Sequence, residues 1–191
     1  LVLWNHGGGT ALGFGYDEMY PDDMLSLSQI GNALSDSGIK FDIVGFDACL
    51  MGTIETAYML EPYADYLVAS EEYEPGTGWY YSEWLKNLSD NTSMPTVEIG
   101  KKIVEDYING PDSSFFDSNT LSIVDLREIP YTYSKLCETM QQEEGVLDSR
   151  YSVISQARYN AKSFGDGEYE QIDIKSYLEE CGKSDTELGK V

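Results

Sequence analysis

Residues 41–47 (FDIVGFD) constrain the fold of this chain more than any other segment. The segment is rich in β-forming residues and mostly apolar, which is typical of a strand buried on both faces of a parallel sheet. Further strands are expected at residues 1–5 and 65–70, and apolar residues at helical spacing predict helices at 25–34 and 53–63. The resulting β-α-β-α-β order predicts an α/β fold: a three-layer α-β-α sandwich with a mostly parallel sheet.

The rest of the chain continues this alternation of helices and strands. A strand is expected at 121–126, and helices at about 81–88, 95–108, 130–144 and 149–163. We expect one core domain over residues 1–165 and the start of a C-terminal extension or subdomain at 166–191. Because the first residues resemble a strand already in progress, we also expect the core to begin with strands that precede Leu1.

Charge and apolar content exclude several classes of partner. The chain has 34 acidic residues against 12 Lys and Arg, a formal net charge of −22. Such a surface repels phosphate backbones and attracts basic peptides, so nucleic acid is not expected as a partner. No apolar run approaches the roughly 18 residues of a membrane span. The three cysteines have no regular spacing and predict no disulfide framework.

His6 is the single histidine of the chain, and its position is informative. It follows the first expected strand and precedes three glycines, Gly7 to Gly9. Ligands of open parallel sheets bind at the carboxyl ends of strands. Glycines there let a substrate approach the backbone and leave N–H groups free to bind an oxyanion. A capping or surface histidine is the alternative interpretation, and the glycines weigh against it.

Cys49 lies at the end of the next parallel strand, so it is expected at the same sheet edge as His6. A thiol beside an imidazole forms a nucleophilic thiolate more readily. Gly52 is expected to open a helix whose N-terminus favours the thiolate further. Asp47, two residues earlier, shares a face with Cys49 if both are extended. Its carboxylate is expected either to bind a cationic side chain or to hold a neighbouring backbone amide.

These motifs together resemble one known family. Residues 4–9 (WNHGGG), 46–52 (FDACLMG), 65–72 (DYLVASEE) and 75–79 (PGTGW) are similar, in this order, to the clostripain family of cysteine peptidases in the caspase-like clan. The similarity is clear from residue 1 to about 88 and weaker to about 178. It implies a caspase-like fold and an endopeptidase that uses a Cys-His dyad and cleaves after Arg or Lys.

The resemblance also implies roles for individual residues. His6 would be the general base and acid and Cys49 the nucleophile, with the backbone amides of Gly7 and Cys49 as the oxyanion hole. Asp47 would line an acidic pocket for the substrate's basic side chain. The substrates of the protein would be peptides or proteins with basic residues. The protein would be secreted or located at the cell surface.

A second pocket wall is implied after the strand that ends at Ser70. Glu71, Glu72 and Glu74 are the candidate acids of this wall, and the sequence does not say which of them point inward. Some relatives carry an acid near the following Gly-x-Gly turn, where this chain has Thr77. The strength of an Arg or Lys preference therefore stays open.

Two alternatives and one cofactor question remain. A lipase-like interpretation of His-Gly-Gly-Gly requires a Gly-x-Ser-x-Gly elbow and a second late histidine, and the chain has neither. A catalytically silent caspase-like module that binds basic peptides is the second alternative. No metal or other cofactor is required by the motifs. Some relatives depend on calcium, and the acids offer oxygen ligands, but no D-x-D-x-D-G loop is present.

Overall fold

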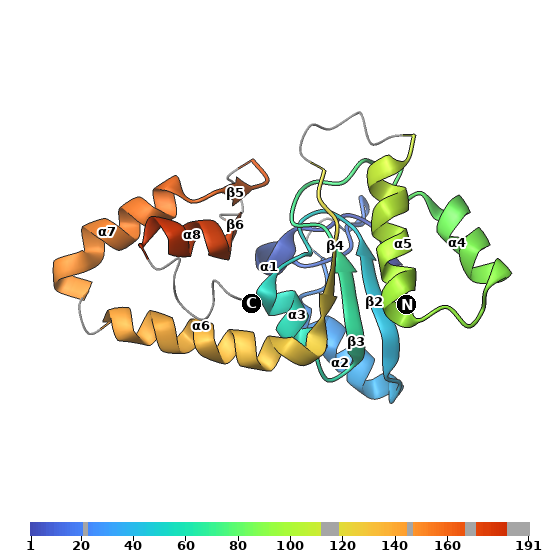
Figure 1. Cartoon of the computed structure of the whole chain (residues 1–191), viewed down its shortest axis with the longest axis horizontal. Helices are drawn as coiled ribbons and strands as arrows, with labels where there is room; N and C mark the ends of the chain where they lie inside the picture. The colour runs from blue at the N-terminus through green and yellow to red at the C-terminus, as the bar shows by residue number, and fades with distance from the viewer. Residues whose placement is uncertain (21–22, 112–118, 145–146, 167–170, 183–191) are drawn as a thin grey trace. The chain divides into compact units, whose positions relative to one another are not determined.

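A mostly parallel sheet organises the N-terminal part of the chain (Figure 1). In the part of the chain that the structure describes, this sheet has four strands in the order β1 (Val2–Trp4), β2 (Phe41–Asp47), β3 (Ala64–Ala69) and β4 (Ser122–Asp125). The first three strands are parallel and β4 is antiparallel to β3. The predicted parallel sheet is therefore confirmed, and β2 has the bounds predicted from its apolar pattern.

The structure is a computed structural model that describes residues 1–20, 23–111, 119–144, 147–166 and 171–182. The chain divides into two compact units, Leu1–Arg127 and Glu128–Val191. The boundary expected near residue 165 falls inside the second unit, after the short strand β5 (Ser163–Phe164).

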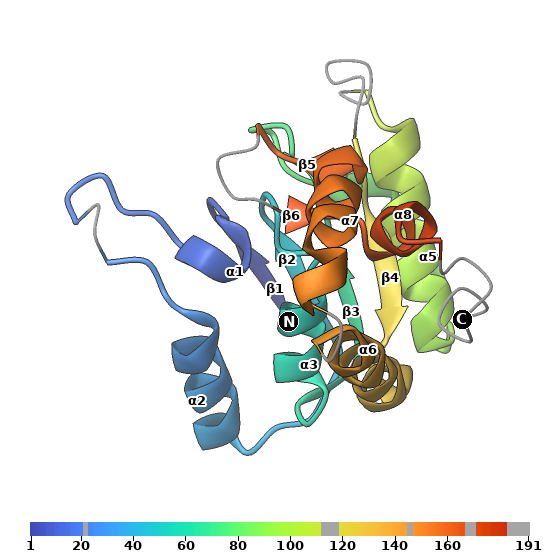
Figure 2. The same ribbon diagram turned by 90° about the vertical axis from the view of Figure 1, so that its left-hand side faces the viewer.

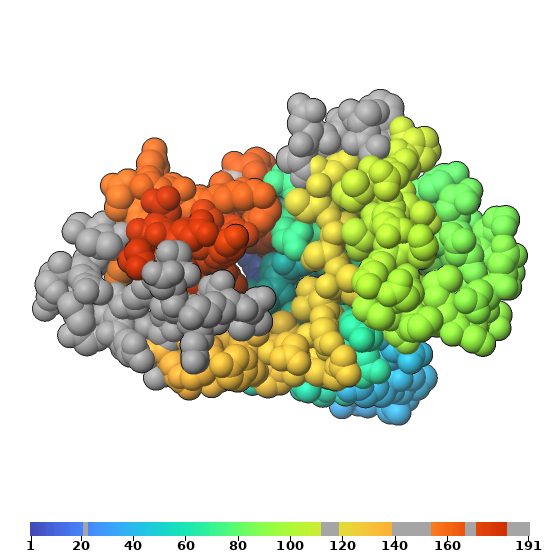
Figure 3. Space-filling model, viewed as in Figure 1, coloured from blue at the N-terminus to red at the C-terminus, as the bar shows by residue number. Residues whose placement is uncertain are grey.

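Helices cover both faces of the sheet (Figure 2). One face carries α1 (Gly9–Leu12), α2 (Leu27–Ser37) and α3 (Ile54–Leu60). The other face is covered by α5 (Thr96–Asn109), and α4 (Tyr81–Asp90) packs beside α5. In the space-filling view the green α4 and the yellow-green α5 form a continuous surface (Figure 3). The three-layer α-β-α sandwich is thus confirmed.

Aromatic side chains fill the layer between the sheet and α5. Trp79 and Trp84 are buried there with Ile103 and Tyr107 of α5. Trp79 packs flat on the sheet because β2 has a glycine beneath it: a Cβ on Gly45 would lie 2.8 Å from the Trp79 ring. This packing fixes the end of the loop that follows β3, and the same loop forms one wall of the candidate site.

Local signals explain where the helices start and stop. Ser26 and Gln29 form a reciprocal capping box at the start of α2, and Gly38 ends the helix in the left-handed conformation. The helix expected to open at Gly52 begins instead at Ile54, because the Thr53 side chain accepts a hydrogen bond from the Thr56 N–H. The short helix α1 begins at the last of the three glycines after His6 and is capped by Gly13, whose φ is 89°.

The second unit contains three helices and a small hairpin among its described residues. These elements are α6 (Ile129–Glu144), α7 (Leu147–Asn160), β5, β6 (Gln171–Ile172) and α8 (Ile174–Glu180). β5 and β6 pair antiparallel. The helix predicted at 149–163 ends at Asn160 because the chain enters β5 three residues later.

Candidate active site

A cleft of about 440 Å³ lies at the carboxyl ends of β1 and β2. His6 lines it from the segment after β1, and Asp47, Ala48 and Cys49 line it from the end of β2. The loop after β3 contributes residues 74–76. The structure therefore brings together three of the residues predicted from sequence, His6, Asp47 and Cys49, at one edge of the sheet.

His6 is held in place through its backbone. The Asn5 side-chain oxygen accepts hydrogen bonds from the His6 N–H at 2.6 Å and from the Tyr16 N–H at 2.9 Å. The His6 carbonyl accepts from the Gly15 N–H at 2.9 Å. The ring of Tyr16 meets the imidazole edge-on, with 5.7 Å between ring centroids. These contacts tie the segment 14–16 to the end of β1 and leave the imidazole exposed to the cleft.

Gly7 brings the histidine segment against the cysteine segment. A Cβ on Gly7 would lie 2.2 Å from the carbonyl oxygen of Cys49 and 3.0 Å from Cγ of Met51. Such distances are too short for any side chain, so the two backbones approach this closely only because residue 7 is a glycine. The contact explains how residues 43 positions apart come to line one cleft.

Cys49 is half-buried on the turn that follows β2. Its Sγ accepts a hydrogen bond from the Glu74 N–H at 3.3 Å. Leu50, the next residue, has φ of 65° and is the one non-glycine residue with positive φ in the described chain. The Leu50 side chain is fully buried, and its N–H donates to the Glu72 carbonyl at 3.2 Å. Buried packing therefore holds a strained turn directly after the thiol.

The environment of Cys49 differs from the one expected. Burial raises the pKa of the Cys49 thiol, the hydrogen bond from the Glu74 N–H opposes this, and the nearby acids Glu74 and Glu72 raise the pKa further. The helix expected to favour the thiolate begins at Ile54 rather than at Gly52. Because the pKa of the thiol is raised, a proton acceptor is needed to generate the nucleophile.

Asp47 is fully buried and holds neighbouring groups in place at the floor of the cleft. Its Oδ2 accepts from the Trp79 N–H at 3.0 Å and from the Tyr81 hydroxyl at 2.7 Å. Burial and the neighbouring Asp47 both raise the pKa of Tyr81, so this hydroxyl stays a donor. Of the two roles expected for Asp47, holding a backbone amide is the one observed, and it joins the end of β2 to the start of α4.

Glu74 is the acid of the loop after β3 that enters the site. Its side chain is 8% exposed, and Oε1 accepts from the Trp79 ring N–H at 3.2 Å. Oε2 is buried without a hydrogen-bond partner. Burial is the main cause that raises the pKa of Glu74 to about 10, and the neighbouring Asp47 raises it as well. Sequence reasoning named Glu74 as one of three candidates but had no signal that distinguished it.

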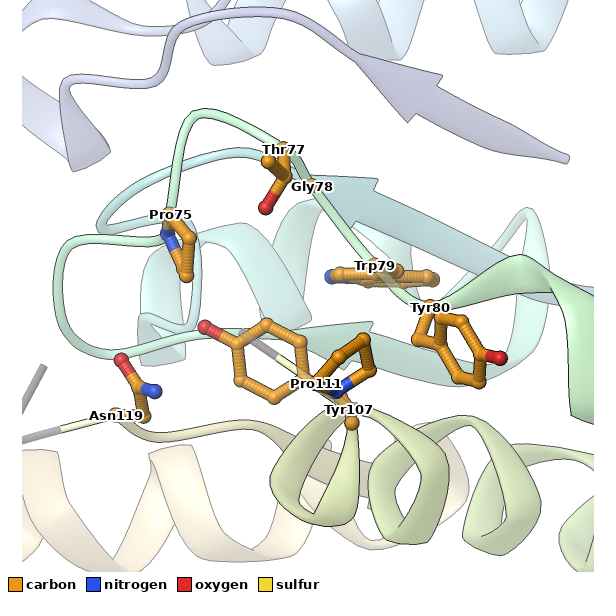
Figure 4. A pocket seen from close by; sticks show the side chains of 9 residues that line it. Pro75, Thr77, Gly78, Trp79, Tyr80, Tyr107, Pro111 and Asn119 are labelled. Carbon is orange, nitrogen blue, oxygen red and sulfur yellow. The ribbon is translucent and has the colours of Figure 1, made fainter. Parts of the chain in front are cut away.

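The other predicted wall residues lie outside this cleft. Ser70 is buried, donates to the Glu72 carbonyl at 2.9 Å and bonds the Thr120 hydroxyl at 3.0 Å, so it shapes the loop. The Glu71 carboxylate accepts from the Ser122 hydroxyl at 2.8 Å. Thr77 lines a separate pocket of about 100 Å³, where it lies near Tyr107 of α5 (Figure 4). In the described residues, no group of three or more His, Cys, Asp or Glu side chains is placed to hold a metal ion.

The fold defines a class. A mostly parallel sheet flanked by helices is the caspase-like fold of C11 cysteine proteases, and in this chain a histidine and a cysteine follow neighbouring strands of that sheet. The chain belongs to the clostripain family, whose family model matches residues 1–186.

Individual relatives agree with this assignment. Clostripain of Hathewaya histolytica is 34% identical over an alignment that covers 44% of this chain and 19% of clostripain. A secreted C11 cysteine protease from Bacteroides thetaiotaomicron, solved with an irreversible peptide inhibitor, is 26% identical, with a TM-score of 0.56 over 70% of this chain and 41% of that one. An inactive zymogen C11 protease from Parabacteroides distasonis, 17% identical, has a TM-score of 0.59 and shows the same fold over 96% of this chain and 51% of that one.

Proposed function

We propose that this chain carries the catalytic centre of a cysteine endopeptidase that cleaves peptide bonds after Arg or Lys. One observation supports this most: His6 and Cys49 line a single cleft, and two buried carboxyl groups, Asp47 and Glu74, lie in the same cleft. The chain spans about half or less of the length of these relatives, so the activity of the whole protein is part of the proposal.

The proposed reaction is acyl transfer through Cys49. His6 accepts the thiol proton, and the thiolate attacks the carbonyl carbon of the scissile peptide bond. His6 then donates its proton to the leaving amine, which departs and leaves a thioester. Water, deprotonated by His6, hydrolyses the thioester and restores the thiol. Because burial raises the pKa of Cys49, the imidazole is needed for this step near neutral pH.

The oxyanion of the tetrahedral intermediate is assigned to the backbone amides of Gly7 and Cys49. The close approach of Gly7 to the Cys49 carbonyl oxygen supports this assignment, because it brings the backbones of the two residues together beside the cleft that His6 and Cys49 line. Amides fixed in this way stabilise developing negative charge without reorganising.

Basic specificity is assigned to the acidic floor of the cleft. Asp47 is the buried carboxylate nearest in sequence to the nucleophile, and a guanidinium or ammonium group is the natural partner of a buried carboxylate. The net charge of −22 also favours encounter with basic peptides and disfavours nucleic acid. Ser70, Glu71 and Thr77, which lie outside this cleft, would then shape the loop after β3 rather than contact the substrate's basic side chain.

A secreted or cell-surface location is proposed with the activity. The Bacteroides thetaiotaomicron relative is described as secreted. Within the described residues, no helix is long and apolar enough to cross a membrane.

Hydrolysis of a panel of fluorogenic peptides tests the proposal. The panel varies the residue before the cut among Arg, Lys, Asp, Asn and Leu, with Cys49→Ala as the control. Cleavage after Arg or Lys that disappears in the control is the expected result. Cysteine-dependent cleavage after another residue would remove the basic specificity and keep the enzyme. Binding of basic peptides by a folded protein that cleaves no substrate would favour the silent module.

A further inference from the structure

We propose that Glu74 is a second specificity carboxyl that shares one proton with Asp47 in the free protein and releases it when a substrate's basic side chain enters. This inference rests on the proposed function and adds a residue and a proton to it. Binding of the cation would convert one carboxylate and one carboxylic acid into two carboxylates that hold the cation. One proton would be released to solution.

One carboxyl oxygen of Glu74 has no hydrogen-bond partner. The side chain is 8% exposed and lines the cleft, and its Oε2 is buried without a partner. A buried carboxylate oxygen without a partner costs free energy that a proton or a bound cation removes. Oε1, by contrast, accepts from the Trp79 ring. This oxygen is therefore where a proton or the cationic group of a substrate would bind.

Asp47 and Glu74 differ in their hydrogen-bond partners. Trp79 joins them, since its backbone N–H donates to Asp47 and its ring N–H donates to Glu74. Asp47 also accepts from the Tyr81 hydroxyl. The Ala48 backbone N–H favours the charged form of Glu74 as well, but Oε2 of Glu74 has no hydrogen-bond partner. Hydrogen bonds to a carboxylate favour its charged form, and two adjacent carboxylates do not ionise equally. The shared proton consequently resides mainly on Glu74, whose pKa burial raises to about 10.

No lysine or arginine lines the described cleft, and every described ion pair lies elsewhere in the chain. The titratable groups around the pair are Cys49, Tyr81 of α4 and Tyr107 of α5, which are neutral at pH 7, and Glu18 and His6 also line the cleft. In the proposed reaction His6 carries a positive charge only while it holds the thiol proton. The lasting cation that would allow both carboxyls to ionise therefore has to come from the substrate.

Glu74 also connects the Asp47–Glu74 pair to the nucleophile. The Glu74 N–H donates to Cys49 Sγ at 3.3 Å, so one residue contacts the thiol through its backbone and lies beside Asp47 through its side chain. A charged Glu74 raises the pKa of the Cys49 thiol. Because Glu74 stays neutral until a cation binds, it adds no uncompensated negative charge beside the Cys49 thiol.

Glu74→Gln is the decisive variant. Glutamine keeps an oxygen that accepts from the Trp79 ring and places an N–H where the neutral acid carries its proton, so it imitates the protonated state permanently. Glu83→Gln on the exposed surface of α4 removes one acid away from the cleft and is the matched control. Substrates with arginine or with citrulline, its neutral isostere, before the cut isolate the contribution of the cation.

The kinetic expectation concerns the arginine-to-citrulline ratio of kcat/KM. In the wild type this ratio should rise with pH, by up to about tenfold per unit, because binding releases a proton. In Glu74→Gln the ratio should fall by about tenfold to a hundredfold and lose its pH dependence. Alkylation of Cys49 by iodoacetamide should change much less, and Glu83→Gln should match the wild type.

Calorimetry gives a second readout that a purely structural role would not change. Binding of an arginine peptide to Cys49→Ala, measured in two buffers of different ionisation enthalpy, should release close to one proton, and the citrulline peptide should release none. An unchanged ratio in Glu74→Gln, or no proton release, would overturn this inference and leave the basic specificity standing. A wild type that does not distinguish arginine from citrulline at any pH would overturn both.

Discussion

The two walls of the cleft are built differently. The histidine wall is exposed: Trp4 is 67% and Tyr16 41% exposed, and hydrogen bonds to backbone groups hold His6 in place. The cysteine wall is buried: Asp47 is 2% and Glu74 8% exposed, and side chains hold the loop after β3. Changes on the histidine wall should therefore affect mainly catalysis, whereas changes on the cysteine wall should also affect stability and pH dependence.

The largest expected effect is on catalysis and compares the two walls directly. Cys49→Ala and His6→Ala should each lower kcat by at least about a thousandfold, because each removes a partner of the same proton transfer. Because the His6 imidazole is exposed, His6→Ala should lower the melting temperature only slightly, through the loss of its edge-on contact with Tyr16. A His6→Ala variant with near-native turnover would show that another group deprotonates the thiol.

Asp47→Asn should reduce stability as well as activity. The amide oxygen can still accept from both the Trp79 N–H and the Tyr81 hydroxyl, but both hydrogen bonds weaken because the acceptor no longer carries a charge, and an NH2 group takes the buried place of Oδ1. We expect a loss of about 1–3 kcal/mol in the free energy of unfolding, measured by urea denaturation. Asn5→Ala, the corresponding removal of a side-chain acceptor on the exposed wall, is the comparison and should cost less than 1 kcal/mol or so. Equal losses would mean that burial does not distinguish the walls.

Glu74→Gln should change the pH dependence of stability. The pKa of Glu74 is raised from 4.5 to about 10 on folding, so the folded state binds the proton more tightly. The stabilising contribution of this proton is fully present below pH 4.5 and is lost as the pH rises toward 10. The melting temperature of the wild type should therefore fall more steeply between pH 5 and 9 than that of Glu74→Gln. Parallel curves would show that Glu74 is already ionised in the folded protein.

The same division separates what could be predicted from the sequence from what could not. The sheet, its parallel order and the strand-end positions of His6 and Cys49 follow from local signals, namely an apolar strand, helical spacing and glycines. These signals were enough to predict the three-layer sandwich and to place both residues at one edge, whereas the caspase-like architecture was implied by the resemblance to the clostripain family.

The inner arrangement of the cysteine wall depends on contacts that are distant in sequence. Asp47 bonds the backbone of a residue 32 positions away, and Glu74 is turned inward by the packing of Trp79 over Gly45. The sequence pattern is the same for Glu71, which instead accepts from a serine of β4. No local rule distinguishes these glutamates, because tertiary contacts decide their direction.

The smallest expected effect concerns Tyr16 on the exposed wall. Its ring meets the His6 imidazole edge-on at 5.7 Å, and such pairs contribute about 0.5–1.5 kcal/mol. Tyr16→Ala should therefore lower kcat by about tenfold at most, with little change in melting temperature. Tyr16→Phe keeps the ring and should restore kcat, which separates ring packing from any role of the hydroxyl. A loss of stability in Tyr16→Ala as large as that in Asp47→Asn would contradict the division between the two walls, because an exposed ring would then stabilise the fold as much as a buried carboxylate.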